Sequence, residues 1–364
     1  GFLISLFGGS RVQIGGPTGA FIVVVYSVIL NHGYDGLVLA TLMAGLILVI
    51  AGLFRAGQLI QHVPEPVING FTIGIAVIIA TSQLRDVFGL SIDTVPAAFF
   101  EKLAALWHVR HSINGPALMI GLSTMVLIVV LRRYFPRFPG LIFAVAITSG
   151  IVVIADLPVD TIQSRFGALV GSLPAPSLPS ITWDRLQELL PSALIIAFLA
   201  GVESLLSAMV ADRMIASQHR PNSELVAQGI ANLGSSLFGG LPATGAIART
   251  ATNVKAGGKT PVAGMAHAII ILVVMLLAAP LAGYLAMPAL AALLILTAWN
   301  MSEPHRWRGY LKDRKSDQFL LLLTGILTVT TDLTIAIGVG VALGLAIRLH
   351  RRNIPVSSYE PPQR

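Results

Sequence analysis

Three side chains stand out because they bring charge or a hydroxyl group into stretches that are otherwise apolar: Glu203, Ser207 and Arg249. Glu203 lies within ALIIAFLAGVESLLSAMVADR. A charged carboxylate at the centre of a bilayer costs roughly 2.5–3.5 kcal/mol, so such a residue usually faces a cavity or a partner. Burial also favours the protonated form of a carboxyl group. We therefore predict that Glu203 carries a proton, and that Ser207, one turn further on, lies on the same helix face.

Arg249 is the matching positive charge. It follows Pro242 by about two helical turns on the same face, and helical side chains lean towards the N-terminus of their helix. Its guanidinium is therefore predicted to reach back towards a bound anion. Two alternatives stay open at this point: Arg249 extends to the membrane surface, or it pairs with Glu203 and only ties two helices together.

The segments before and after these residues repeat. SLFGG occurs at 5–9 and again at 236–240, and the two copies run into GGPTGA and LPATGA. Proline suits the first turn of a helix, and glycine lets the backbone approach a ligand closely. Both motifs thus predict helix N-termini, whose free N–H groups and dipoles attract an anion. The residues predicted to bind it are Thr18, Gly19, Ala20, Thr244, Gly245 and Ala246.

The composition places these motifs in a membrane. Hydrophobic residues make up 55% of the 364 residues, charged residues 11%, and the mean hydropathy is +0.80. These values exclude a soluble globular protein. The net charge of +7 comes from short basic segments between apolar runs, which favours membrane orientation over nucleic-acid binding. The absence of cysteine excludes thiolate metal sites, and no catalytic set stands out, so we expect no enzymatic activity, no catalytic residues, no metal and no cofactor.

The apolar runs and their breakers predict the membrane helices. Full spans are expected at 36–54, 64–84, 114–131, 139–155, 190–211, 224–238, 261–280, 286–300, 317–332 and 334–349. The segments 17–30 and 242–254 are shorter, because each reaches only about 20 Å of the ~30 Å hydrocarbon core. Each is a half-span, and the non-helical residues before it are expected to pair as short strands, since unpaired backbone is not tolerated at that depth.

Alternating the sides of the membrane through these spans places most of the 24 Lys and Arg residues on one face. The positive-inside rule makes that face cytoplasmic and puts the C-terminus there. The two half-spans then cross in opposite directions, so the repeats are inverted. Inverted repeats with broken helices in matching positions indicate a transporter whose substrate site lies at mid-membrane. A chance recurrence of a helix-end signature is the alternative.

Four segments resemble the sulfate permease family, also called solute carrier family 26: SLFGGSRVQIGGPTGAFIVV, VPEPVINGFTIGIAVIIATSQL, LPSITWDRLQELLPSALIIAFLAGVESLLSA and ANLGSSLFGGLPATGAIARTATNVKAGGKTPVAG. The resemblance implies an all-α membrane fold with fourteen transmembrane segments in two inverted repeats of seven. It further implies a core domain at 1–55 and 188–280, a gate domain at 56–187 and 281–350, and a linker at 351–364 towards a cytoplasmic STAS domain. The first segment, most of the second and the STAS domain are expected to lie outside this chain.

Motif by motif, the resemblance places Thr18 and its neighbours at the family's anion site. Ala246 and Ile247 fall at its backbone site on the tenth segment, and Arg249 is its basic residue. Glu203 and Ser207 fall where some bacterial members hold a coupling proton or cation.

The leading hypothesis is a secondary active anion transporter of the bacterial inner membrane. It would carry a carboxylate or dicarboxylate, such as fumarate, together with a proton by an elevator-type movement, and the full-length protein would be a homodimer. Sodium-coupled uptake of bicarbonate or sulfate, and anion exchange, are the nearest alternatives. An anion channel on the same fold is the alternative of another class, and a nucleobase transporter of similar architecture is disfavoured by Arg249.

Overall fold

The computed structural model describes residues 1–60, 64–92, 95–96, 98–135, 139–169, 171–331 and 333–352; residues 353–364 of the expected linker lie outside it. The chain folds into helices and two very short strands. In chain order they are α1 (Phe2–Phe7), β1 (Gly15–Gly16), η1 (Gly19–Phe21), α2 (Ile22–Leu53), α3 (Gly57–Ile60), α4 (Glu65–Phe88), α5 (Phe99–His108), η2 (Arg110–Ser112), α6 (Gly115–Tyr134), α7 (Gly140–Ile154), α8 (Ile162–Phe166), α9 (Trp183–Ile215), α10 (Pro221–Leu237), β2 (Thr244–Gly245), α11 (Ile247–Lys255), α12 (Val262–Ala282), α13 (Met287–Met301), η3 (Pro304–Arg306), α14 (Trp307–Tyr310), α15 (Lys315–Thr330) and α16 (Leu333–Arg352).

Every predicted full span coincides with a helix of the structure. Among the described residues, five helices are long and apolar enough to cross a membrane: Ile22–Leu53, Glu65–Phe88, Gly115–Tyr134, Trp183–Asp212 and Val262–Ala282. One of these spans begins earlier than predicted. Helix α9, which covers the span expected at 190–211, starts at Trp183 and continues through Pro191. The N-cap Thr182 accepts a hydrogen bond from the backbone N–H of Arg185 and so starts this helix early.

The first half-span and the span that follows it form one element with a break. Helix α2 contains Gly33, whose backbone has φ 72° and ψ 179°, values that do not belong to a helix. Glycine tolerates this conformation because it has no Cβ. The break separates the half-helix that begins at Ile22 from the full span predicted at 36–54.

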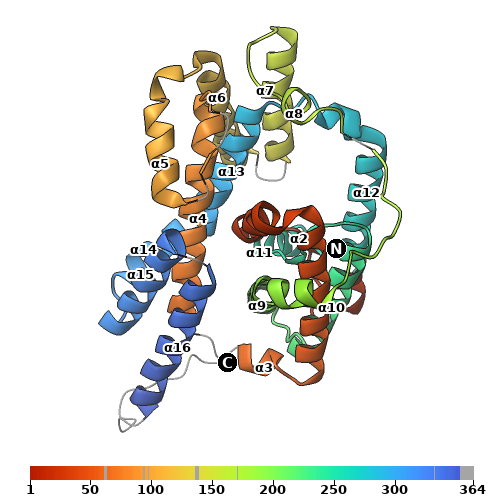
Figure 1. The fold of residues 1–364 in the computed structure, drawn as a ribbon, viewed down its shortest axis with the longest axis vertical. Helices are drawn as coiled ribbons and strands as arrows, with labels where there is room; N and C mark the ends of the chain where they lie inside the picture. Colours follow the sequence, from red (N-terminus) through yellow and green to blue (C-terminus); the bar gives the residue numbers. More distant parts are fainter. Residues whose placement is uncertain are drawn as a thin grey trace.

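The helices form two bundles (Figure 1). Helices α1, α2, α9, α10, α11 and α12 form one group through their mutual contacts, in which α1 contacts β1 and α9 contacts β2; we call this group the site bundle. Helices α4, α6, α7, α13, α15 and α16 form the second bundle, in which α4 packs against α13 and α15. The chain passes from the site bundle to the second bundle after α3, returns after α8, and leaves the site bundle again after α12 (Figure 1).

Small residues bring the main helices of the site bundle into close contact. A Cβ built on Gly45 of α2 would lie 2.9 Å from the carbonyl oxygen of Gly229 on α10. A Cβ on Gly229 would lie 2.6 Å from the carbonyl oxygen of Gly45. Both separations are shorter than a carbon atom tolerates, so this crossing requires glycine on both helices. Small residues at such crossings are typical of helix packing in lipid.

The two bundles meet through apolar side chains. Helix α4 contacts the turn η1 and helix α2. One cluster of buried residues joins Phe21 and Val24, at the start of the half-helix, to Phe71 and Ile75 of α4. The packing that holds the half-helix against the second bundle is therefore non-directional, as hydrophobic contacts are.

Candidate functional site

The site is built around a two-stranded ribbon. Strands β1 and β2 pair antiparallel, with Gly15 opposite Gly245 and Gly16 opposite Thr244. All four residues are buried. The predicted pairing of the two repeats as short strands is thus confirmed, and it joins segments about 230 residues apart in the sequence.

The register of the ribbon fixes where the half-helices begin. Because the strands are antiparallel, η1 and α2 leave the ribbon from the end marked by Gly16, and α11 leaves from the end marked by Gly245. Both helices start within a few residues of the ribbon and run away from it. The first N–H groups of any helix have no partner within the helix. Their N-termini therefore bring positive dipole ends to the same small region.

Glu203 contacts the start of the first half-helix. It projects from α9, and its Oε2 accepts a hydrogen bond of 2.9 Å from Oγ1 of Thr18. Thr18 is the N-cap of η1 in an extended conformation, and its side chain is used for this contact rather than for capping the helix. The structure thus brings together Glu203, the predicted coupling residue, and Thr18, a predicted anion-site residue.

Arg249 reaches back towards the N-terminus of its helix, as predicted. Its Nη2 donates a hydrogen bond of 2.6 Å to the carbonyl oxygen of Pro17. A Cβ on Gly16 would lie 3.0 Å from Nη1 of Arg249, so the guanidinium lies directly against the ribbon. A direct pair with Glu203 is not among the ion pairs of the described part of the chain. The arrangement favours the predicted inward reach over extension to the membrane surface.

Ser207 lies behind the ribbon. It is completely buried, and its Oγ donates a hydrogen bond of 3.0 Å to Oγ1 of Thr250 on α11. Thr250 Oγ1 in turn accepts from the backbone N–H of Ile14, at 3.1 Å. The serine therefore links α9 to α11 and to the residue before β1, while its predicted share in cation binding stays a prediction.

The remaining predicted residues are arranged around the ribbon. Thr244 is buried, and its hydroxyl donates to the carbonyl oxygen of Ala200 at 2.8 Å. Ala246 is the N-cap of α11, and its N–H donates to the carbonyl oxygen of Ile14 at 2.9 Å. Ile247 opens α11, while Gly19 and Ala20 belong to η1. Thr244 and Ala246 support the ribbon. The predicted start of the second half-span at Pro242 is wrong: Thr244 and Gly245 form β2, and the helix begins only at Ile247.

One buried acidic residue was missed by the sequence reasoning. Glu224, in the first turn of α10, is completely buried and accepts hydrogen bonds from Gly9, Ser10, Ser204 and Gln228. The predicted membrane spans therefore contain a completely buried carboxylate in addition to Glu203. The available signal was the polar stripe formed by Glu224, Gln228 and Asn232, spaced one helical turn apart.

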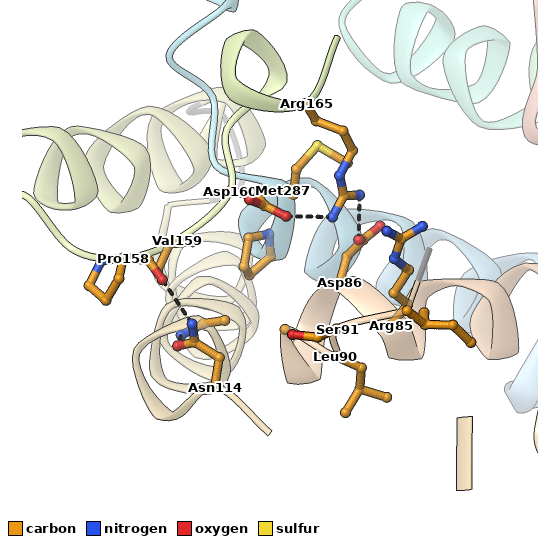
Figure 2. Close-up of a pocket in the computed structure, with 14 residues that line it drawn as sticks. Arg85, Asp86, Leu90, Ser91, Asn114, Pro158, Val159, Asp160, Arg165 and Met287 are labelled. Atoms are coloured by element: carbon orange, nitrogen blue, oxygen red, sulfur yellow. Dashed lines mark hydrogen bonds and ion pairs between the residues drawn. The ribbon is translucent and has the colours of Figure 1, made fainter. Parts of the chain in front are cut away.

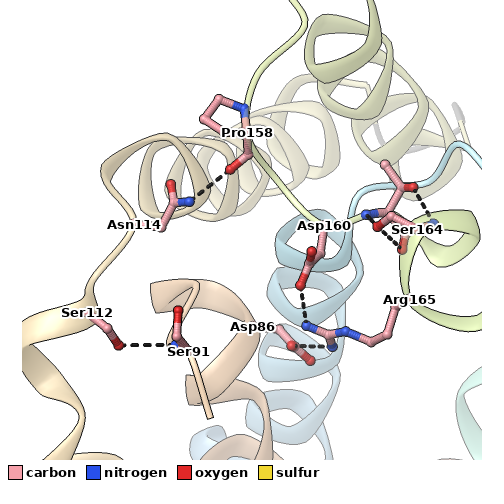
Figure 3. A network of polar contacts seen from close by, with 9 residues as sticks. Asp86, Ser91, Ser112, Asn114, Pro158, Asp160, Ser164 and Arg165 are labelled. Carbon is pink, nitrogen blue, oxygen red and sulfur yellow. Dashed lines mark hydrogen bonds and ion pairs between the residues drawn. The ribbon is translucent and has the colours of Figure 1, made fainter. Parts of the chain in front are cut away.

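A polar cavity of about 480 Å³ lies in the second bundle, where α4 ends and α6 begins (Figure 2). Figure 2 shows Arg165 between Asp86 and Asp160, to which it donates at 2.6 and 2.8 Å. Burial lowers the pKa of Arg165, but the hydrogen bonds and charges of the two aspartates outweigh this and hold the pKa above its usual value. In Figure 3, Asn114 holds the carbonyl of Pro158 nearby. The positive charge of Arg165 is thus matched, and we interpret this cluster as a structural anchor.

The described residues contain no group of three or more His, Asp or Glu side chains able to hold a metal ion. The ribbon brings together groups of a different kind. It combines two helix N-termini, one guanidinium, and one carboxylate that contacts the first helix start through Thr18.

Comparison with known proteins gives one matching family. The model of the sulfate permease family matches residues 1–324. The chain is 43% identical over 337 residues to the putative sulfate transporter YvdB of Bacillus subtilis, covering 92% of this chain and 63% of that protein. It is 32% identical over 349 residues to the bicarbonate transporter BicA of Synechocystis sp., covering 92% of this chain and 60% of that protein. The chain thus spans less than two thirds of the length of these relatives.

Solved structures agree with this match. The transmembrane domain of a cyanobacterium bicarbonate transporter BicA is similar with a TM-score of 0.80 and 28% identity, covering 94% of this chain and 87% of that one. SLC26A9 has a TM-score of 0.84 at 18% identity, covering 97% of this chain and 60% of that one, and supports the fold alone. The predicted all-α membrane fold is therefore confirmed.

Proposed function

The chain belongs to the sulfate permease family, and from this premise we propose that it forms the membrane part of a secondary active anion transporter. One observation carries the proposal: the ribbon brings both half-helix starts and the guanidinium of Arg249 to one place. Helix N-termini and arginine are the groups with which proteins bind anions.

For the substrate, we propose an inorganic oxyanion, either sulfate or bicarbonate. The relatives named above are called a putative sulfate transporter and a bicarbonate transporter, which favours these ions over the dicarboxylate that the sequence suggested. Both ions present several oxygen acceptors to the N–H groups of the two helix starts. The dicarboxylate remains the second candidate, because the same groups suit a carboxylate.

For the driving force, we propose that Glu203 carries a coupling proton. Its Oε2 accepts from Thr18, a residue at the predicted anion site, so protonation of the carboxyl group and occupation of the site act on the same helix start. Sodium is the alternative coupling ion, since Glu203 and Ser207 offer oxygen ligands from one helix face.

For the movement, we propose that the site bundle is the core domain and the second bundle the gate domain, and that the core moves against the gate as in an elevator. The apolar packing of Phe21 and Val24 against Phe71 and Ile75 supports this, because non-directional contacts allow sliding without the loss of specific hydrogen bonds. We further propose a bacterial inner-membrane location, a cytoplasmic C-terminus and a homodimer of the full-length protein.

Uptake into proteoliposomes tests the proposal. The full-length protein is reconstituted and supplied with labelled sulfate, bicarbonate or fumarate, with a pH gradient, a sodium gradient or neither. We expect saturable uptake of sulfate or bicarbonate that the pH gradient accelerates. Acceleration by the sodium gradient alone would mean that sodium, and not the proton, is the coupling ion. Ion currents far above carrier turnover would identify a channel. Absence of uptake of all three anions under every gradient would overturn the proposed function.

A further inference from the structure

The two segments that lead into the ribbon are both held by helix α10. The first arm, residues 8–14, connects α1 to β1, and the second arm, residues 238–243, connects α10 to β2. Helix α10 presents Glu224, Gln228 and Asn232 on one face, and all three are completely buried. A buried polar side chain in a membrane helix is costly unless it is hydrogen-bonded, so the partners of this stripe indicate its role.

Glu224 holds the first arm. Its Oε2 accepts from the backbone N–H groups of Gly9 and Ser10 at 2.9 and 3.2 Å. Its Oε1 accepts from Oγ of Ser204 at 2.9 Å and from Nε2 of Gln228 at 2.8 Å. Four donors thus meet the two oxygens of a single carboxylate. An ionised carboxylate is an acceptor only and has room for all four.

Asn232 holds the second arm. Its Nδ2 donates to the carbonyl oxygen of Ala243 at 2.8 Å, and its Oδ1 accepts from the N–H of the same residue at 2.9 Å. Ala243 directly precedes Thr244 of β2. The same helix face therefore fixes the backbone before each strand.

The carboxylate of Glu224 is also connected to the proposed site through α9. Ser204, which donates to Glu224, directly follows Glu203 in the chain. The carbonyl and hydroxyl oxygens of Ser204 both lie 3.2 Å from Nε2 of Gln13 on the first arm. The first arm, Glu224 and the turn of α9 that carries Glu203 thus form one hydrogen-bonded unit.

We propose that Glu224 is a positioning residue: its carboxylate fixes the first arm, and through it the register of the ribbon and the start of the half-helix at Thr18. The inference rests on the proposed function in one respect, namely that the ribbon borders the anion site. Glu224 does not touch the anion, and it acts by placing Thr18 and the Pro17 carbonyl that Arg249 contacts.

The test uses Glu224→Gln, which keeps the size of the side chain. An amide has only one oxygen that accepts hydrogen bonds, and its NH₂ group would face donors. Some of the four hydrogen bonds that Glu224 accepts must therefore be lost. The matched control is Glu101→Gln, the same change at an exposed position on α5, which packs beside α4 of the second bundle. The decisive variant is the exchange Glu224→Gln with Gln228→Glu, which keeps a carboxylate in the stripe but moves it one turn away from Gly9 and Ser10.

The first readout follows the arm and is independent of transport. Residues 1–364 contain no cysteine, so Ser10→Cys supplies the one thiol of this part of the protein, at a side chain that is only 5% exposed. We expect Glu224→Gln to raise the labelling rate of this thiol by about tenfold or more, because hydrogen bonds to a charged group are among the strong ones. The exchange variant should label equally fast, and Glu101→Gln should label at the unaltered rate.

The second readout is anion uptake by full-length protein with the same substitutions but without Ser10→Cys. We expect Glu224→Gln and the exchange variant to raise KM by about tenfold or more with a smaller change in the maximum rate, since a displaced site binds less well. The proposal is overturned if Glu224→Gln leaves both the labelling rate and KM unchanged. It is also overturned if the exchange variant returns both to the values of the unaltered protein. Labelling can also rise while neither the unaltered protein nor any variant transports an anion. In that case the positioning role of Glu224 is supported and the proposed function fails.

Discussion

Replacing Glu203 by glutamine separates the two roles that the geometry gives to this residue. The Oε1 of a glutamine can still accept the hydrogen bond that Thr18 donates to Glu203, now 2.9 Å long. The position of the helix start should therefore survive the change. Only the ability to take up and release a proton is lost. We expect anion binding to persist and proton coupling to disappear.

The size of the effect follows from the proton gradient. One pH unit corresponds to about 1.36 kcal/mol per proton, and this free energy equals a tenfold concentration ratio. With the membrane potential held at zero and one proton per anion, the unaltered protein should accumulate its substrate about tenfold per pH unit. The Glu203→Gln variant should equilibrate the anion across the membrane, with no accumulation and a KM within about threefold of the unaltered value.

The assay is uptake of labelled sulfate into proteoliposomes at imposed gradients of zero, one and two pH units. Glu101→Gln, an exposed glutamate on α5, serves as the control and should accumulate normally. Accumulation by Glu203→Gln that still rises tenfold per pH unit would refute the assignment of the proton to this carboxyl group. A KM raised far beyond threefold would instead refute the claim that the hydrogen bond with Thr18 is kept.

Three further changes test other parts of the structure. Arg249→Ala removes the guanidinium that contacts the carbonyl of Pro17. It should raise the KM for the anion by about 10- to 150-fold, since a hydrogen bond to a charged group is worth roughly 1.5–3 kcal/mol. A KM within twofold of the unaltered value would contradict a role of Arg249 in anion binding. Gly229→Leu should lower the Tm, because overpacking costs about 1–3 kcal/mol and even a Cβ there meets α2 at 2.6 Å. Gly150→Ala on α7, where a Cβ meets nothing within 4 Å, is its control and should not lower the Tm, because alanine favours a helix over glycine. Asp86→Asn should destabilise the second bundle by about 1–3 kcal/mol in thermal unfolding but leave KM unaltered, because the side chain of Asp86 is only 13% exposed and pairs with Arg165.

The broken helices could be predicted because their signals are local. Pro17 and Pro242, with the glycines that follow them, announce a nearby helix start, although the helices begin two and five residues later, at Gly19 and Ile247. The half-spans are too short to cross the bilayer. The repetition of SLFGG added the expectation that the two segments meet, and the pairing of Gly16 with Thr244 confirms it. The inward reach of Arg249 was also predictable, since a helical side chain leans towards the N-terminus of its own helix.

The buried polar contacts could not be predicted, because they join residues far apart in the chain. Glu224 follows the helix start at Pro221 closely, and an acidic residue in the first turn of a helix is favourable even when it is exposed. Its burial depends on Gly9 and Ser10 packing over α10. The contact of Ser207 with Thr250 is of the same kind: the spacing gave the helix face of the serine but not the helix opposite it.

The two arms of the inverted repeat are supported by different chemistry, and the backbone explains the difference. The first arm presents two successive N–H groups, at Gly9 and Ser10, and successive N–H groups form a site for an anion. The second arm presents the N–H and the carbonyl of one residue, Ala243, which a neutral amide satisfies with one acceptor and one donor. A carboxylate in place of Asn232 would face that carbonyl, and an amide in place of Glu224 would face an N–H. The groups that each arm offers therefore decide whether α10 presents a charged or a neutral side chain, although both arms begin in the repeated SLFGG sequence.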